Sequence, residues 1–323
     1  RGRRAFWGLA RWAWIPLLAL VAWQWLHPGS YLAAFPARSL HGHPLTLLPS
    51  QAVGPFLHPS ILANYSALLF IVVYVGQRLG LPAAGGWIGT AALPAYLLLL
   101  LGSGERQELL GLMAVLLAWE IQRLSGLRRA LALLANLAVG LILAGAFFLL
   151  YQQSLTRELD TWGLSGGYVS TQHEHPRAAI YRHSFAVADG HFPLGSGLGT
   201  YGSAAAEKFD DSLYADLGFA RYPWYGRENY LMDTYWPAFV AETGWIGALL
   251  LLACYGGWWR HAGRQMRAAE EREAAAFWGL AYTCLGYFLV LSATSPAFQD
   301  PVLFLLPGAL MGIAARHYGK EEG

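Results

Sequence analysis

The sequence is poor in charge. Lysine, arginine, aspartate and glutamate make up 13% of its 323 residues, whereas 55% are hydrophobic, and a soluble domain carries about twice that charged fraction. The net charge of +2 is small and the basic residues form no single patch, which argues against nucleic acid as a partner. The apolar residues fall in long runs separated by short polar segments, so the composition predicts a membrane protein.

Cysteine is nearly absent, and no repeat or low-complexity tract stands out. Cys254 and Cys284 lie inside apolar runs, so we expect buried thiols rather than a disulfide. The lack of an internal repeat weakens a repeat-built transporter. We expect no cleavable signal peptide at Arg1, Arg3 and Arg4, because the apolar stretch that follows is long and has no small-residue cleavage site. Because the first residue is not methionine, we expect a fragment with spans missing upstream.

Eight apolar segments are long enough, or nearly so, to cross about 30 Å of hydrocarbon. They are 5–26, 60–79, 84–101, 106–123, 128–151, 238–259, 274–293 and 301–317. The third is the weakest, because prolines and glycines interrupt it. The predicted fold is an all-α, polytopic membrane helix bundle with a long, partly helical extracytoplasmic loop. Its predicted parts are helices 1–5 in residues 1–150, the catalytic loop in 151–237 and helices 6–8 in 238–323.

Basic residues are unequally shared between the two sides of the predicted bundle. With the N-terminus inside, the short outer loops carry only Arg38 and Arg106. The positive-inside rule then places the following segments outside: 27–59, 102–105, 151–237 and 294–300. Residues 27–59 are expected to form a loop with a short interfacial helix. Arg106 stands where the chain returns to the membrane, so it should face the bundle interior or snorkel outward.

Residues 151–237 are too long for a simple connection and must carry structure of their own. The loop is rich in acids, tyrosine and tryptophan, which suits sugar rings and phosphates, although an interfacial aromatic belt explains part of this composition. Three helical pieces are expected: 177–188 after Pro176, 200–211 after a glycine turn, and 228–240 before the sixth span.

The glycine turn runs from Pro193 to Tyr201. Residues 197–202 formally match G-x-G-x-x-G, but no strand precedes them and no βαβ unit surrounds them, so we reject a dinucleotide site. Two interpretations stay open. The turn either brings backbone N–H groups close to an anion or is purely structural.

Two charged motifs lie earlier in the loop. Arg177 and Arg182, with His183, form a cationic helix whose guanidinium groups suit phosphate oxygens; pairing with loop acids is the alternative. The run His173-Glu174-His175 lacks a clear third ligand, so we expect a solvated loop and no metal.

Four stretches share their order, spacing and sidedness with one family. The first two are Leu45-Thr46-Leu47-Leu48-Pro49 and Gly102-Ser103-Gly104-Glu105-Arg106. The third runs from Arg177 through Pro193-Leu194-Gly195-Ser196-Gly197-Leu198-Gly199-Thr200-Tyr201. The fourth joins Asp233-Thr234-Tyr235-Trp236 to Ala241-Glu242-Thr243-Gly244-Trp245-Ile246-Gly247. Over residues 45–255 the chain resembles the O-antigen polymerase and ligase superfamily, bacterial enzymes that act on undecaprenyl-diphosphate-linked glycans.

The resemblance implies a metal-independent glycosyltransferase without a cofactor, in the bacterial inner membrane, with its active site on the periplasmic side. It implies transfer of an undecaprenyl-diphosphate-linked oligosaccharide onto another lipid-linked repeat unit. Its implied partners are that oligosaccharide, membrane lipid, and chain-length regulator and flippase proteins. The catalytic residues that we predict are Arg106, Arg177 and Asp233. The predicted substrate-binding residues are Arg182, His183, Gly197, Gly199, Tyr201, Glu228 and Tyr235.

One departure from the family pattern bears on the reaction. Ligases of this superfamily usually carry His-Asn where this chain has Asp233-Thr234, and that histidine is the proposed base. Its absence favours a polymerase, with an O-antigen or protein O-glycan ligase as the alternative. It leaves the base open among Asp233, Glu228 and the loop histidines. The alternative from a different functional class is a membrane transporter. It predicts ionisable residues deep in the spans, and Glu120 beside Arg123 is explained by snorkelling.

Overall fold

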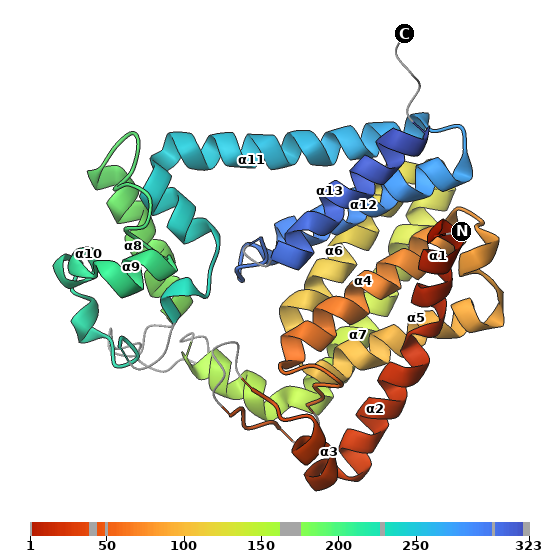
Figure 1. The fold of residues 1–323 in the computed structure, drawn as a ribbon, viewed down its shortest axis with the longest axis horizontal. Coiled ribbons are helices and arrows are strands. Elements are labelled where there is room, and N and C mark those ends of the chain that lie inside the picture. Colours follow the sequence, from red (N-terminus) through yellow and green to blue (C-terminus); the bar gives the residue numbers. More distant parts are fainter. Residues whose placement is uncertain are drawn as a thin grey trace. The chain divides into compact units, whose positions relative to one another are not determined.

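Helices are the only regular elements in the part of the chain that the computed structural model describes, which is 2–38, 44–48, 51–161, 176–226, 230–298 and 301–318. One isolated bridge joins Arg38 and Pro44. Six helical segments are long and apolar enough to cross a membrane. The expectation of an all-α, multi-span membrane protein is confirmed at this level (Figure 1).

The six candidate spans coincide with six of the eight predicted ones. They are Ala5–Leu26, Pro59–Arg78, Gly86–Ser103, Ala130–Leu150, Trp236–Ala268 and Arg272–Leu291. The predicted fourth span is the helix α6 (Arg106–Arg123), which has charged residues at both ends. The predicted eighth falls in α13 (Pro301–Tyr318), whose apolar stretch Leu305–Arg316 is shorter.

Two compact units make up the chain. The first comprises Arg1–Tyr151, Arg260–Tyr287 and Leu306–Gly323, and the second comprises Gln152–Trp259 and Phe288–Leu305. The helices that lie within the first unit are α1 (Gly2–Trp12), α2 (Trp14–Leu26), α3 (Pro28–Ala34), α4 (Pro59–Arg78), the 3-10 helix η1 (Pro82–Ala84), α5 (Gly86–Ser103) and α6. Three helices besides α13 contribute residues to both units: α7 (Gly126–Thr161), α11 (Trp236–Ala268) and α12 (Arg272–Leu291).

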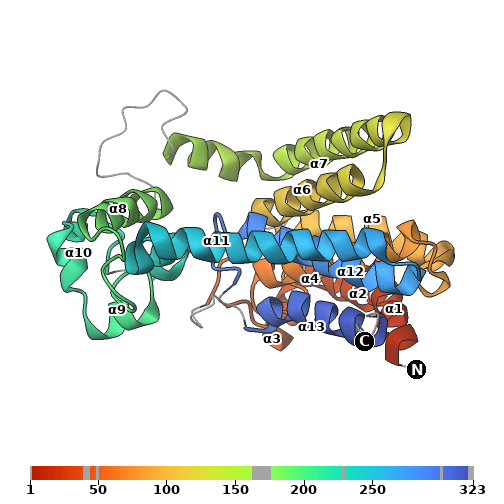
Figure 2. The ribbon, with the colours of Figure 1, turned by 90° about the horizontal axis from the view of Figure 1, so that it is seen from above.

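The second unit contains the described part of the long loop (Figure 2). Its own helices are α8 (Pro176–Gly190), α9 (Ala204–Phe209), α10 (Ser212–Asp216), η3 (Phe219–Arg221) and η4 (Tyr230–Met232). The prediction of a helix over 177–188 is confirmed by α8. The predicted helix over 200–211 is shorter, because Ser203 caps α9 by accepting a hydrogen bond from the Ala206 N–H. In the described part of the helix predicted over 228–240, the structure has the short η4 and then an α-helix that begins at Trp236.

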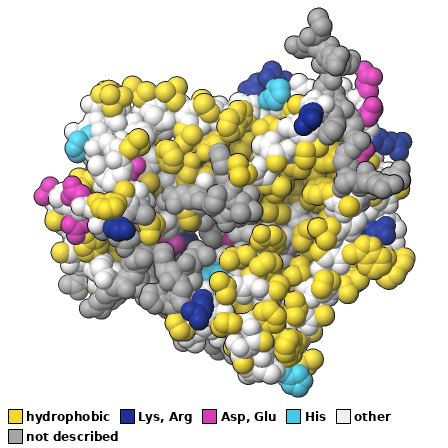
Figure 3. Space-filling model, viewed as in Figure 1, with side chains coloured by type: hydrophobic (Ala, Val, Ile, Leu, Met, Phe, Trp, Pro, Cys, Tyr) yellow, Lys and Arg dark blue, Asp and Glu magenta, His cyan; other side chains and the backbone are white. Residues whose placement is uncertain are grey.

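Tryptophan side chains pack against glycines in the core of the first unit. A Cβ on Gly76 would lie 3.0 Å from the Trp7 ring, and a Cβ on Gly279 would lie 2.6 Å from the Trp119 ring. Small residues allow such close approach between membrane helices. Hydrophobic side chains also gather on the face of this unit that Figure 3 shows, as expected of a surface that faces lipid.

Glu120 corrects one expectation. It does not snorkel to a helix end, because only 1% of its side chain is exposed. Its Oε2 accepts a hydrogen bond from Arg78 Nη2 at 2.7 Å, and its Oε1 accepts one from the Tyr74 hydroxyl. Arg123 instead donates to the Arg78 carbonyl. A cation and a phenol on α4 therefore keep this carboxylate buried in α6.

Both cysteines are free, but only Cys284 is buried as expected. Cys254 is exposed. The apolar run around it could not distinguish a side chain facing lipid from one facing protein, because both surroundings are apolar. The short helix expected within 27–59 is confirmed by α3.

Candidate functional site

Helix α8 carries the two arginines on which the predicted site depends. Pro176 is its first residue, where proline fits without losing a hydrogen bond. Its buried side follows a helical spacing and includes Ile180, His183 and Val187. Arg182 follows Arg177 by five positions, which turns it by about 140° around the helix axis. The two guanidinium groups consequently serve different faces of α8.

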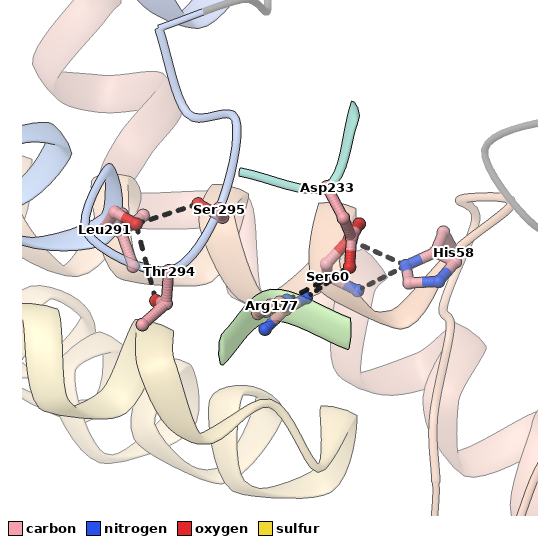
Figure 4. Close-up of polar contacts among 7 residues, drawn as sticks. All are labelled: His58, Ser60, Arg177, Asp233, Leu291, Thr294 and Ser295. Carbon is pink, nitrogen blue, oxygen red and sulfur yellow. Dashed lines mark hydrogen bonds and ion pairs between the residues drawn. The ribbon is translucent and has the colours of Figure 1, made fainter. Parts of the chain in front are cut away.

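Arg177 pairs with Asp233. Its Nε and Nη2 atoms both donate to Asp233 Oδ2, at 3.0 and 2.8 Å. Figure 4 shows the two side chains directed at one another. Each side chain is 33% exposed, so the pair lies at a surface that solvent reaches. Among the described residues no hydrogen bond reaches Oδ1. The pair thus combines a fixed positive group with one carboxylate oxygen, Oδ1, that accepts no hydrogen bond from the described residues.

Aromatic contacts hold the segment around Asp233 in place. The Tyr235 hydroxyl lies 2.8 Å from the Tyr255 hydroxyl, and its ring packs 5.3 Å from that of Phe298. Trp236 Nε1 donates to Ser292 Oγ at 2.9 Å. Tyr235 was predicted to bind substrate, and the structure places it at 4% exposure inside this aromatic cluster. These contacts of Tyr235 fix the chain two residues after Asp233.

Tyr181 anchors α8 on the same face as Arg177. It lies one helical turn after Arg177, and its hydroxyl donates to the Ala293 carbonyl at 2.6 Å. Burial raises the pKa of Tyr181, and the charge of Arg177 lowers it to a smaller extent. The Arg177 side of α8 is therefore attached to the segment that follows α12.

Arg182 and His183 belong to a second group of side chains. Arg182 Nη2 donates to the Tyr222 hydroxyl at 2.6 Å, and Arg221 Nη2 donates to the same oxygen at 3.0 Å. His183 Nε2 lies 3.0 Å from that hydroxyl and 3.1 Å from Arg221 Nη2. His183 is buried and its ring packs 4.8 Å from that of Phe219. We call Arg182, His183, Arg221 and Tyr222 the Arg182–Arg221 cluster.

The glycine turn is bonded to a break in α11. Gly244 has φ 65° and ψ −174°, which interrupts the helix. The carbonyls of Ala241 and Glu242, which a continuous helix would bond internally, accept from the N–H groups of Ser196 and Gly197 at 2.9 and 3.0 Å. The turn and the broken helix thus satisfy each other's backbone groups.

The side chain of Glu242 adds to this junction. It is 9% exposed, and its Oε1 accepts the Tyr201 N–H at 3.0 Å. The Gly202 N–H donates to the Tyr214 hydroxyl at 2.6 Å. Of the two interpretations of the turn, these bonds favour the structural one for Ser196, Gly197, Tyr201 and Gly202, whose N–H groups have partners within the protein.

Tyr201 lies in the core of the second unit. It is fully buried and its hydroxyl donates to the Ile180 carbonyl at 2.7 Å. Burial holds the pKa of Tyr201 well above its ordinary value. Its ring stacks on Tyr214 at 5.3 Å. It was predicted to bind substrate, and the structure gives it a packing position instead. Gly199 lies in the same turn with φ 81°.

Arg106 is the first residue of α6 and is half-buried. It follows Gly104, whose φ of 77° ends α5. Arg106 belongs to the first unit and Arg177 to the second, so their joint action on one diphosphate stays a prediction. Glu228 and the run 173–175 lie outside the described residues. Within the described part, no group of three or more histidine, cysteine, aspartate or glutamate side chains could hold a metal ion.

Sequence reasoning missed Arg221, Tyr222 and Glu242 as members of these groups. Glu242 lies in the fourth of the stretches that resemble the family, and its spacing to Gly244 is the available signal. Arg221 and Tyr222 reach His183 across about forty positions, and neither periodicity nor a short motif reports such a contact. No protein-family model matches the chain, and no curated protein is detectably similar to it.

Proposed function

We propose that the protein is a glycan polymerase that uses an undecaprenyl-diphosphate-linked donor. The Arg177–Asp233 pair carries this proposal, because it sets a guanidinium and a partly unengaged carboxylate at an accessible surface. The second support is the resemblance of four ordered stretches to the O-antigen polymerase and ligase superfamily. On this proposal all eight apolar segments span the bacterial inner membrane, and the second unit's loop faces the periplasm.

In the proposed reaction the bond between the anomeric carbon and the diphosphate oxygen breaks. A hydroxyl oxygen of a second lipid-linked repeat unit forms the new bond to that carbon. The diphosphate gains charge as it leaves, and fixed guanidinium groups stabilise such charge best where water is scarce. Arg177 supplies that stabilisation, and Arg106 is proposed to do so as well.

The acceptor hydroxyl must lose a proton in this step. Asp233 is the proposed acceptor of that proton, through Oδ1, while Oδ2 is held by Arg177. Arg177 thereby has two roles, since it orients the base and carries a positive charge beside the reacting groups. The protonated carboxyl then returns its proton to solvent, and the diphosphate lipid is released.

The alternative function, a membrane transporter, would require ionisable residues within the spans to line a transport path. Glu120 is one, but its pairing with Arg78 gives it a structural role. Glu108 is also buried, and it lies in the first turn of α6, where the helix dipole favours a carboxylate. The pairing of Glu120 with Arg78 therefore removes that residue as support for a transport path.

The test is chain lengthening by the purified protein in lipid nanodiscs, supplied with an undecaprenyl-diphosphate oligosaccharide. The wild type should give a ladder of lipid-linked products. Asp233→Asn and Arg177→Ala should each lower the rate by about 100-fold or more, because a positioned base or a charge-stabilising donor contributes that much. Arg106→Ala is expected to do the same.

Lys208→Gln is the matched control, because it removes an exposed positive charge from the same unit outside both groups. It should leave the ladder unchanged. A wild-type ladder that persists in both Asp233→Asn and Arg177→Ala would overturn the assignment. Addition of lipid A core as a second acceptor separates a polymerase from a ligase, since only a ligase would label it.

A further inference from the structure

Two large apolar side chains stand exposed at the start of the glycine turn. Phe192 is 70% exposed and Leu194 is 68% exposed. The sequence around them, residues 190–206, contains no aspartate, glutamate, lysine or arginine. Exposed apolar side chains in a stretch without charge mark a surface that contacts a membrane or a partner.

The turn is fixed against the bend in α11 (Figure 1). A Cβ on Gly244 would lie 2.3 Å from the Pro193 carbonyl oxygen and 2.8 Å from the Leu194 carbonyl carbon. The N–H of Ser196 donates to the Ala241 carbonyl at 2.9 Å. The backbone of Leu194 therefore lies against the residue after which the longer part of α11 begins.

The length of α11 sets the depth of this bend. The helix is long and apolar enough to cross a membrane. After Gly244 the next charged residue is Arg260, and at about 1.5 Å per residue the intervening stretch 245–259 is about 22 Å long. The hydrocarbon core is about 30 Å thick, and snorkelling of Arg260 covers part of the difference. In a spanning α11, Gly244 consequently lies near the boundary of the hydrocarbon.

Trp245 has the contacts of a tryptophan at such a boundary. Its ring stacks on Phe185 at 5.5 Å with an interplanar angle of 15°, and its Nε1 donates to Asp189 Oδ1 at 2.8 Å. Asp189 itself is exposed. Tryptophan is enriched where its apolar body meets lipid and its N–H meets a polar group. The residue after Gly244 thus supports the same depth.

The exposed apolar surface continues along α11. Leu249 and Leu250 are each 62% exposed. Leu249 lies five residues after Gly244, which is about 7.5 Å along the helix axis. Interfacial segments bury their apolar side chains about 5–10 Å deep at the headgroup boundary. Phe192 and Leu194 are therefore held within that depth range of side chains expected to face lipid.

We propose that Phe192 and Leu194 insert between the lipid headgroups and the upper acyl chains, beside α11. Lipid is the occupant because the turn carries no charge and is bonded to the helix at the membrane boundary. The inserted pair attaches the end of α8, whose first turn carries Arg177, to the bilayer. This inference depends on α11 crossing the membrane and is independent of the proposed reaction.

Leu198 is not part of the inserted pair. It follows Gly197, whose N–H donates to the Glu242 carbonyl at 3.0 Å. Glu242 precedes the bend, on the side of Gly244 away from the long part of α11. Insertion is thus confined to the start of the turn, and Leu198 stays in contact with water.

The first test measures the depth of single probes. In a Cys254→Ser/Cys284→Ala background, Phe192→Cys and Leu194→Cys are labelled in detergent with an environment-sensitive fluorophore and reconstituted in phosphatidylcholine nanodiscs. Phosphatidylcholine that is spin-labelled near the top of its acyl chains should quench each probe by about half or more, because the probe lies within the leaflet. Both side chains are exposed, so these substitutions leave the core intact.

Phe209→Cys is the matched control. Phe209 is 78% exposed in the same unit, but the charged residues Lys208, Asp210 and Asp211 flank it, so it belongs in water. Its probe should be quenched by aqueous iodide and not by the spin-labelled lipid. The proposal is overturned if the probe at Phe192 or at Leu194 responds to the two quenchers as the Phe209 probe does.

The second test uses the unsubstituted chain. Nanodiscs of a phosphatidylcholine with a diazirine in the upper acyl chain are irradiated, and lipid adducts are located by mass spectrometry. Adducts are expected at Phe192 or Leu194 and at Leu249 or Leu250, and none at Phe209. Adducts at the α11 leucines alone, or at none of these positions, would overturn the insertion. Loss of chain lengthening in Asp233→Asn leaves both lipid contacts unchanged, so this proposal and the proposed function fail separately.

Discussion

At the scale of single residues, Gly195 and Gly244 lie where two backbone segments of the second unit approach closely. A Cβ on Gly195 would lie 2.4 Å from the Ala241 carbonyl oxygen, and a Cβ on Gly244 would lie 2.3 Å from that of Pro193. Both glycines also have positive φ, of 78° and 65°, which other residues adopt at a cost. These two positions admit no side chain.

Gly195→Ala and Gly244→Ala should each lower the free energy of unfolding by about 2–4 kcal/mol, through backbone strain and displacement of the junction. Thermal unfolding of the purified protein, followed by size-exclusion chromatography, measures the change. Gly256→Ala in α11 is the matched control, since nothing lies within 4 Å of its Cβ position. A wild-type unfolding temperature in both junction variants would contradict this expectation.

The residues of the candidate site could be predicted, but not how they are grouped. The chemistry of arginine and the family resemblance predict Arg177, and only its position in the family pattern predicts Asp233. Their hydrogen bonds connect segments that no local pattern links. Arg182 was expected to assist Arg177, yet helical geometry turns it to another face of α8. Tyr201 looked like a binding residue because tyrosine suits sugars, and only packing shows that it is buried.

At the scale of elements, one ion pair links α4 to α6. Arg78→Met leaves the buried Glu120 carboxylate without its cation, so stability should fall by about 2–4 kcal/mol. The lower end of that range applies because 40% of the Arg78 side chain is exposed. The unfolding temperature measures the loss.

The double variant Arg78→Met/Glu120→Leu should recover much of that stability, because no buried charge remains unpaired. Arg264→Met, which removes an exposed arginine from α11, should change stability by less than about 0.5 kcal/mol. If Arg78→Met is as stable as Arg264→Met, the pair does not hold the two helices together.

Most helices could be predicted because long apolar runs and Pro176 mark them in the sequence. The start of α11 could not be predicted from the sequence in this way. Residues 233–235 have no helical hydrogen bonds in the structure, since Asp233 is directed to Arg177 and Tyr235 to its aromatic cluster. Tertiary contacts there override local helix preference.

At the scale of the whole molecule, the orientation in the membrane can be tested. In a Cys254→Ser/Cys284→Ala background, Leu198→Cys should react with a membrane-impermeant maleimide in spheroplasts, because Leu198 is 80% exposed in the loop placed outside. Leu127→Cys, 75% exposed at the start of α7, should react only after permeabilisation. Labelling in the opposite order would reverse the topology.

The junction between the glycine turn and α11 has a consequence for searches that use short sequence patterns. Its two halves lie about fifty positions apart and share no chemistry, but each supplies the backbone groups that the other needs. A pair of patterns centred on Gly195 and Gly244 would therefore retrieve chains that build the same joint, whatever reaction they catalyse. Retrieval by the proposed activity would have to use the Arg177 and Asp233 positions instead.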